Sequence, residues 1–281
     1  MKLSATEFRE EKNKAITLLG MSGVGKTFLS TILRQSDWFH YSGDYRIGSR
    51  YLNEPILDNI KKQAMDVPFL RDLLRSDSIY ITNNIAFENL AIMSTFLGKI
   101  GDPELGGLSL EEFKKRQKLF YDAEYAAMFD VPEFKQKAQD IYGLNHFVND
   151  AGGSLCEFDD ESVFEMLAEH SIILYIQAND ADEKRLIERA TAAPKPMYYR
   201  AQYLDEQLAI YMQEQQLEYV SMIVPDEFVR WVFPRLFYDR IPRYERIAKQ
   251  YGYTIKTDDL YKIKTEQDFL TLVEKALDEQ N

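Results

Sequence analysis

Short apolar segments alternate with long helical patterns along the chain. Each apolar segment has the character of a strand that is buried on both faces of a parallel sheet. We predict five such strands, at Ala15–Leu19, Trp38–Tyr41, His146–Val148, Ile172–Ile176 and Tyr253–Ile255. This alternation predicts an α/β fold in which a mostly parallel five-stranded sheet lies between two layers of helices.

The predicted strands are unevenly spaced, and a long helical region separates the second from the third. Helices are predicted at Glu54–Met65 and Ile85–Lys99, followed by a helix that begins after Ser109. Ser109 and Glu112 have the spacing of a capping box, in which both side chains bind backbone N–H groups at the start of a helix. Pro132 is expected to start a further helix through Tyr142.

A second helical block, Ala201–Tyr251, lies between the fourth and fifth strands and is expected to be punctuated by Pro225, Pro234 and Pro242. We therefore expect a single domain over residues 1–281, with helical insertions at about 52–143 and 201–251. The first insertion would bind an acceptor or form a lid, since the glycines and proline of residues 83–108 are typical of a mobile loop.

The charge and cysteine content narrow the functional classes. The chain has 34 basic and 46 acidic residues and a formal net charge of −12, which disfavours binding to nucleic acid. A single cysteine, Cys156, permits no internal disulfide and fits a reducing compartment. The first fourteen residues are charged and no apolar stretch is long enough to span a bilayer, so we expect a cytoplasmic protein with no membrane partner. The sequence leaves open whether the protein forms a homodimer.

Residues Gly20–Thr27 match the pattern G-x-x-x-x-G-K-[ST], between a predicted strand and a predicted helix. Backbone N–H groups of such a loop bind phosphates, Lys26 adds a positive charge for the β- and γ-phosphates, and the Thr27 hydroxyl can bind Mg²⁺. The sequence therefore predicts a phosphate-binding loop, or P-loop, with ATP and Mg²⁺ as cofactors. The predicted nucleotide ligands are Gly20, Ser22, Gly23, Val24, Gly25, Lys26, Thr27 and Phe28.

Asp44 and Arg46 follow the second predicted strand, at the edge of the sheet where open α/β folds bind ligands. Asp44 would accept a proton from a substrate hydroxyl, and Arg46, with Arg50, would bind a substrate anion. The alternative is a turn aspartate beside surface arginines.

The third predicted strand ends in Asp150, which is followed by Gly152 and Gly153. This segment resembles a Walker B element, in which the aspartate helps to hold Mg²⁺. The glycines would let backbone N–H groups approach a substrate. The alternative is a turn that Asp and Gly stabilise.

The phosphate-binding loop followed by Gly43-Asp44-x-Arg46-x-Gly48 resembles adenylylsulfate kinase and, more loosely, shikimate and gluconate kinases. The resemblance to this superfamily of P-loop small-molecule kinases implies that Asp44 orients or deprotonates the acceptor hydroxyl and that Arg46 binds the acceptor.

The resemblance also implies an arginine-bearing lid after the fourth strand, within residues 180–200. Lid candidates are Arg185, Arg189, Lys195 and Arg200, of which Arg185 and Arg189 would act on the transferring phosphoryl group. The alternative is a solvated helix face with Glu–Arg pairs.

These features predict transfer of the γ-phosphoryl group of ATP to a hydroxyl of a small, anionic metabolite. The alternative is a P-loop ATPase that acts as a switch or is coupled to a protein partner. A GTPase is disfavoured because no guanine-specific N-K-x-D sequence is present. A binding module without turnover is disfavoured because Lys26 and Thr27 are both present.

Overall fold

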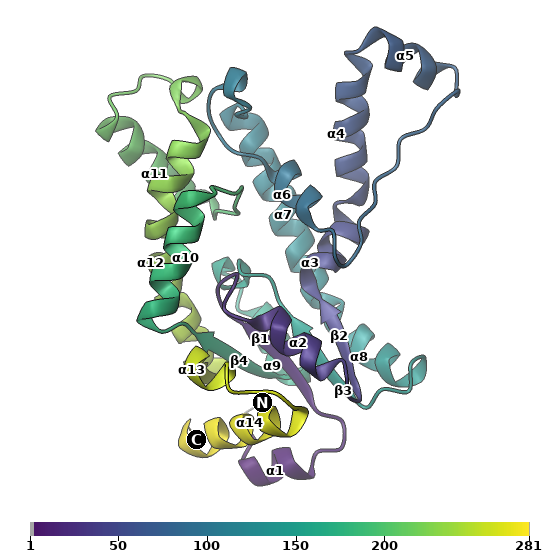
Figure 1. The fold of residues 1–281 in the computed structure, drawn as a ribbon, viewed down its shortest axis with the longest axis vertical. Coiled ribbons are helices and arrows are strands. Elements are labelled where there is room, and N and C mark those ends of the chain that lie inside the picture. Colours follow the sequence, from purple (N-terminus) through teal and green to yellow (C-terminus); the bar gives the residue numbers. More distant parts are fainter. Residues whose placement is uncertain (1–2, 281) are drawn as a thin grey trace.

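The computed structural model describes residues 3–280, and its centre is a sheet of five parallel strands. The strand order is β2-β3-β1-β4-β5 (Figure 1). The strands are β1 (Ala15–Leu19), β2 (Trp38–Ser42), β3 (His146–Asp150), β4 (Ile172–Gln177) and β5 (Gly252–Lys256). All five predicted strands are present, and each predicted range differs from the observed one by no more than two residues at either end. The predicted α/β class is confirmed.

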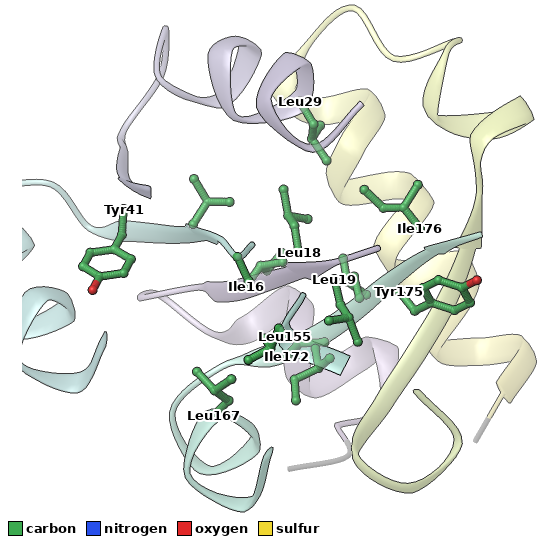
Figure 2. Packing of buried hydrophobic residues seen from close by; sticks show 14 of the residues in the cluster. Ile16, Leu18, Leu19, Leu29, Tyr41, Leu155, Leu167, Ile172, Tyr175 and Ile176 are labelled. Carbon is green, nitrogen blue, oxygen red and sulfur yellow. The ribbon is translucent and has the colours of Figure 1, made fainter. Parts of the chain in front are cut away.

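Helices cover both faces of the sheet, which explains why its central strands β1 and β4 are apolar almost throughout. Ile16 and Leu18 of β1 are completely buried. Figure 2 shows Leu29, from the helix α2 (Lys26–Leu33), on one face of the sheet and Leu167, from α9 (Ser162–His170), on the other. The short helix α1 (Ala5–Glu10) packs against the C-terminal helix α14 (Glu266–Gln280).

The region between β2 and β3 is helical, as predicted, and part of it extends away from the sheet (Figure 1). Its elements are α3 (Gly43–Arg46), a π-helix (Ile47–Tyr51), α4 (Asn53–Met65), α5 (Pro68–Arg75), α6 (Ala91–Leu97), a 3-10 turn (Pro103–Leu105), α7 (Leu110–Phe129) and α8 (Val131–Asp140). The helix predicted at Ile85–Lys99 was too long. Its first residues form a tight turn, in which Asn89 N donates to Ala86 O at 2.9 Å.

The predicted capping box at Ser109 is half formed. The Ser109 hydroxyl accepts from Glu112 N at 3.3 Å, as a helix cap does. The reciprocal contact is not formed, because the Glu112 carboxylate accepts from Arg116 Nε at 2.7 Å instead.

The region between β4 and β5 contains α10 (Asp180–Ala192), α11 (Ala201–Glu214), a 3-10 turn (Val220–Met222) and α12 (Pro225–Tyr251). Pro225 begins α12, but the expectation that Pro234 and Pro242 interrupt the helix was wrong. Buried residues between and after these prolines, including Leu236 and Tyr244, hold α12 against the rest of the fold. Tertiary packing therefore outweighs the loss of two backbone hydrogen bonds.

The two helical insertions share a second apolar cluster apart from the sheet. Its largest buried members are Phe113 of α7, Tyr199 just before α11, Tyr203 and Tyr211 of α11, and Phe228 of α12. The short helix α13 (Thr257–Leu260) follows β5. Within the described residues, no helix is both long and apolar enough to cross a membrane.

Candidate functional site

The phosphate-binding loop connects β1 to α2 at the carboxyl edge of the sheet. From β1 the chain crosses to β2 in one direction, and from β3 it crosses past β1 to β4 in the other, so the loop lies at a switch point where α/β sheets bind ligands. Gly23 and Gly25 have φ angles of 93° and 106°, which favour glycine. The loop therefore has the backbone that the motif predicts.

Lys26 is the first residue of α2, and its side chain folds back over the loop. Nζ donates to Gly20 O at 2.7 Å and to Met21 O at 3.1 Å, and the residue is buried. Burial lowers the pKa of Lys26, while the nearby carboxylate of Asp150 opposes this shift. An ammonium held only by carbonyl groups can turn toward phosphate oxygens when these enter the loop.

Thr27 and Asp150 meet at the centre of the site. Thr27 Oγ1 donates to Asp150 Oδ2 at 2.8 Å. The contact arises because β3 pairs with β1, so that the end of β3 lies beside the start of α2. A hydroxyl and a carboxylate in contact can hold Mg²⁺ together with phosphate oxygens and water. Across the described part of the chain, no group of three or more His, Cys, Asp and Glu side chains is placed to hold a metal ion by itself.

Asp44 faces the same cavity, which has a volume of about 190 Å³. Its lining consists of Ser22, Gly23, Gly25, Lys26, Thr27, Phe28, Asp44, Asp150, Ala151 and Gly153. The residue as a whole is exposed to solvent. Partial desolvation of its carboxyl raises the pKa of Asp44, the charge of Asp150 raises it further, and Lys26 opposes both. The cavity thus brings together the predicted phosphate, metal and base residues.

Glu124 of α7 is a buried carboxyl behind this cavity that sequence reasoning missed. Its Oε2 accepts from Ser154 Oγ at 2.6 Å, while Oε1 has no hydrogen-bond partner among residues 3–280. A Cβ on Gly152 would lie 2.3 Å from Glu124 Oε1 and 3.3 Å from Asp44 Oδ1. A side chain at residue 152 would therefore displace the Glu124 carboxyl. Burial raises the pKa of Glu124 to about 8.

A second buried carboxylate, Glu157, connects α12 to the turn after β3. It accepts from Arg240 Nε at 2.6 Å and from Arg200 Nη1 at 2.8 Å. Arg240 also donates to Gly153 O at 3.3 Å, and the Tyr244 hydroxyl donates to the same oxygen. These contacts hold the Gly153 carbonyl in place, so the position of this cavity-lining residue depends on α12.

The structure does not bring Arg46 into the cavity lining. Asp44 and Arg46 lie two residues apart in the short helix α3, and side chains at that spacing point to different sides of a helix. Arg46 Nε donates to Asp130 Oδ2 at 2.6 Å, and the guanidinium packs over the Phe134 ring at 4.8 Å. Arg50 is exposed and also lies outside the lining. Their role as acceptor ligands stays a prediction.

The four lid candidates differ in where they lie. Arg189 of α10 reaches the phosphate-binding loop, since its Nη2 donates to Ser22 O at 3.4 Å. Arg185 donates to Asp182 at 2.6 Å and to the Tyr261 hydroxyl at 2.8 Å instead. Lys195 is exposed, and Arg200 is held by Glu157 and Asp239. The geometry places one of the four, Arg189, over the loop.

The loop, the strand order and the Thr27–Asp150 contact define an α/β protein with a P-loop nucleotide-binding site. No protein-family model matches the chain, and no curated protein matches it in sequence. Among solved structures, the chain is similar to a shikimate kinase from Bacteroides thetaiotaomicron, with 15% sequence identity and a TM-score of 0.42. The match covers 93% of this chain and 95% of that chain.

Proposed function

We propose that this protein is an ATP-dependent phosphotransferase that moves the γ-phosphoryl group of ATP to a hydroxyl of a small molecule. The observation that carries the proposal is that one cavity contains Lys26, Thr27, Asp150 and Asp44. Groups suited to the phosphates, the metal and the acceptor hydroxyl therefore line one cavity.

Each residue has a distinct role in this proposal. The loop N–H groups and Lys26 bind the β- and γ-phosphates, and Arg189 adds positive charge from α10. Thr27 and Asp150 hold Mg²⁺, which neutralises charge on the phosphates. Asp44 orients the acceptor hydroxyl and accepts its proton during transfer. Since the pKa of Asp44 is raised, its carboxylate is a better proton acceptor than an aspartate with the ordinary pKa.

Two substitutions test these roles separately. Lys26→Ala should lower turnover by about 10²–10³ because it removes a charge that stabilises the transferring group. Asp44→Asn has nearly the same size and should lower phosphoryl transfer by about 10²–10⁴ while ATP binding, measured by calorimetry, changes little. Lys184→Ala, at an exposed position on α10, is the matched control.

The assay must distinguish transfer from hydrolysis, since a P-loop ATPase is the alternative. ADP release is measured together with formation of a phosphate ester, with MgATP and a panel of hydroxyl compounds. Formation of a phosphate ester by the wild type, and its loss in Asp44→Asn, would support the proposed kinase function. Release of ADP and inorganic phosphate at equal rates in wild type and Asp44→Asn, with no ester, would favour the ATPase.

A further inference from the structure

His40 of β2 has a buried imidazole ring that the proposed function does not use. Its side chain is 2% exposed, and both ring nitrogens are buried. Among residues 3–280, neither Nδ1 nor Nε2 has a hydrogen-bond partner. A buried polar group without a partner costs about 1–3 kcal/mol of stability, so its presence in a folded protein calls for an explanation.

The imidazole faces Asp150, the carboxylate that would hold Mg²⁺. His40 Nε2 lies 3.6 Å from Asp150 Oδ2, the oxygen that also accepts from Thr27 Oγ1. The sheet explains this placement, because Ser42 of β2 pairs with Asp150 of β3. His40, two residues before Ser42, points to the same face of the sheet. The separation is too long for a hydrogen bond, and a movement of about 0.5–1 Å would close it.

An aromatic ring packs against the same imidazole. Phe87 lies edge-on to His40, with 4.9 Å between the ring centroids. The guanidinium of Arg34, from α2, lies over the Phe87 ring at 5.3 Å. The imidazole therefore lies between an apolar neighbour and a carboxylate, and its nitrogens have no exposed surface from which to bind bulk water. Asp150 Oδ2 is the acceptor toward which an Nε2–H group can donate.

This contact requires no change in the charge of His40. A neutral imidazole carries one N–H group, and an acceptor beside Nε2 selects the form with the proton on that atom. With Thr27 and His40 both directed at Oδ2, the Asp150 carboxylate is fixed in orientation, and Oδ1 remains for Mg²⁺ or for a water molecule bound to it. Replacing a residue that orients a metal ligand in this way lowers metal affinity by about 10–100-fold.

We propose that His40 is a positioning residue for the metal site. Its Nε2–H group donates to Asp150 Oδ2 and holds this carboxylate toward Mg²⁺ when MgATP is bound. The inference rests on the metal site of the proposed function, and on no property of the acceptor. It gives the buried imidazole a partner, and it means that the carboxylate is fixed from two elements, α2 through Thr27 and β2 through His40.

The test measures the metal-dependent part of nucleotide binding, which requires no turnover. Calorimetry gives the Kd of a non-hydrolysable ATP analogue with Mg²⁺ and again with EDTA, and the metal factor is the ratio by which Mg²⁺ tightens binding. His40→Leu and His40→Phe replace the donor by a small and a large apolar side chain, while His40→Gln keeps an N–H group. We expect the metal factor to fall by about tenfold or more in the first two variants and to stay within about threefold of wild type in His40→Gln.

Two comparisons separate positioning from a general loss of packing. His146→Phe replaces a histidine at the opposite end of β3 from Asp150, and it should leave the metal factor unchanged. Asp150→Ala should remove the contribution of the carboxylate, so adding His40→Leu to it should lower the metal factor no further. Circular dichroism checks that each variant is folded, and either apolar variant alone is enough for the comparison.

The outcomes distinguish this inference from the proposed function. An unchanged metal factor in the apolar variants would overturn the inference, and so would an equal loss of affinity with Mg²⁺ and with EDTA, which would mean that His40 only supports the fold. A further fall in the double variant would also overturn it. A wild-type protein whose binding does not respond to Mg²⁺ would overturn both the inference and the metal site. The expected pattern in a protein that forms no phosphate ester would support the role of His40 and count against phosphoryl transfer.

Discussion

Replacing Glu157 by glutamine should destabilise the fold strongly, because its carboxylate is fully buried between two guanidinium groups. The two contacts are 2.6 Å to Arg240 and 2.8 Å to Arg200. Glutamine keeps the size of the side chain but removes the charge, and its amide N–H groups would face one of the guanidiniums. Removing one partner of a buried ion pair costs about 3–5 kcal/mol. Since Arg200 keeps Asp239 as a second partner, we expect about 3 kcal/mol.

A matched control is available nearby. Glu161 also pairs with an arginine of α12, Arg246, but the two side chains are 40% and 41% exposed. Exposed pairs contribute less than about 1 kcal/mol, so Glu161→Gln should have a small effect. The two variants make the same chemical change on the same helix interface and differ mainly in burial.

Urea unfolding followed by tryptophan fluorescence measures both effects. Equal losses of unfolding free energy in Glu157→Gln and Glu161→Gln would refute the buried network. Because Arg240 also donates to Gly153 O, Glu157→Gln should reduce phosphoryl transfer as well, at temperatures where the variant is still folded.

Three further substitutions address the site and its surroundings. Arg189→Ala should lower the rate of phosphoryl transfer by about 10²–10³, because it removes the guanidinium over the loop. Arg185→Ala, the control on the same helix, should stay near the wild-type rate. Equal initial rates for the two variants would contradict the role of Arg189 at the phosphates. Glu124→Gln should remove a pH dependence of stability. The folded protein keeps the Glu124 proton up to a pH of about 8, while the unfolded chain releases it near 4.5, so the wild-type free energy of unfolding should fall as pH rises through this window. Urea titrations across that pH range should show a smaller fall of the free energy of unfolding in Glu124→Gln than in the wild type. The same fall in both proteins would show that Glu124 is ionised in the folded state.

The sheet could be predicted because its strands are buried on both faces. Ala15–Leu19 and Ile172–Gln177 are apolar almost throughout, so each strand is visible without knowledge of its neighbours. The helical regions were predicted less well where local and tertiary preferences conflict. Pro234 and Pro242 disfavour a helix locally, and only the packing of α12 against the rest of the fold keeps it continuous.

The site residues also fall into two groups: those that a sequence motif predicts and those that only the folded structure reveals. Lys26, Thr27 and Asp150 were predicted because a motif fixes their spacing relative to adjacent strands. Arg46 was predicted as an acceptor ligand from its position two residues after Asp44, and the sequence did not show that this segment is helical and turns the two side chains apart. Glu124 could not be predicted, since it lies within the long helix α7 and no local pattern distinguishes it from the exposed acids there.

The most direct test of the account is ³¹P NMR of the wild-type protein, and of Asp44→Asn beside it, with MgATP and the panel of hydroxyl compounds. We predict a new phosphate-ester resonance that grows together with ADP in the wild type and is absent in the variant. Inorganic phosphate as the sole product with every acceptor, at the same rate in both proteins, would contradict phosphoryl transfer at this site.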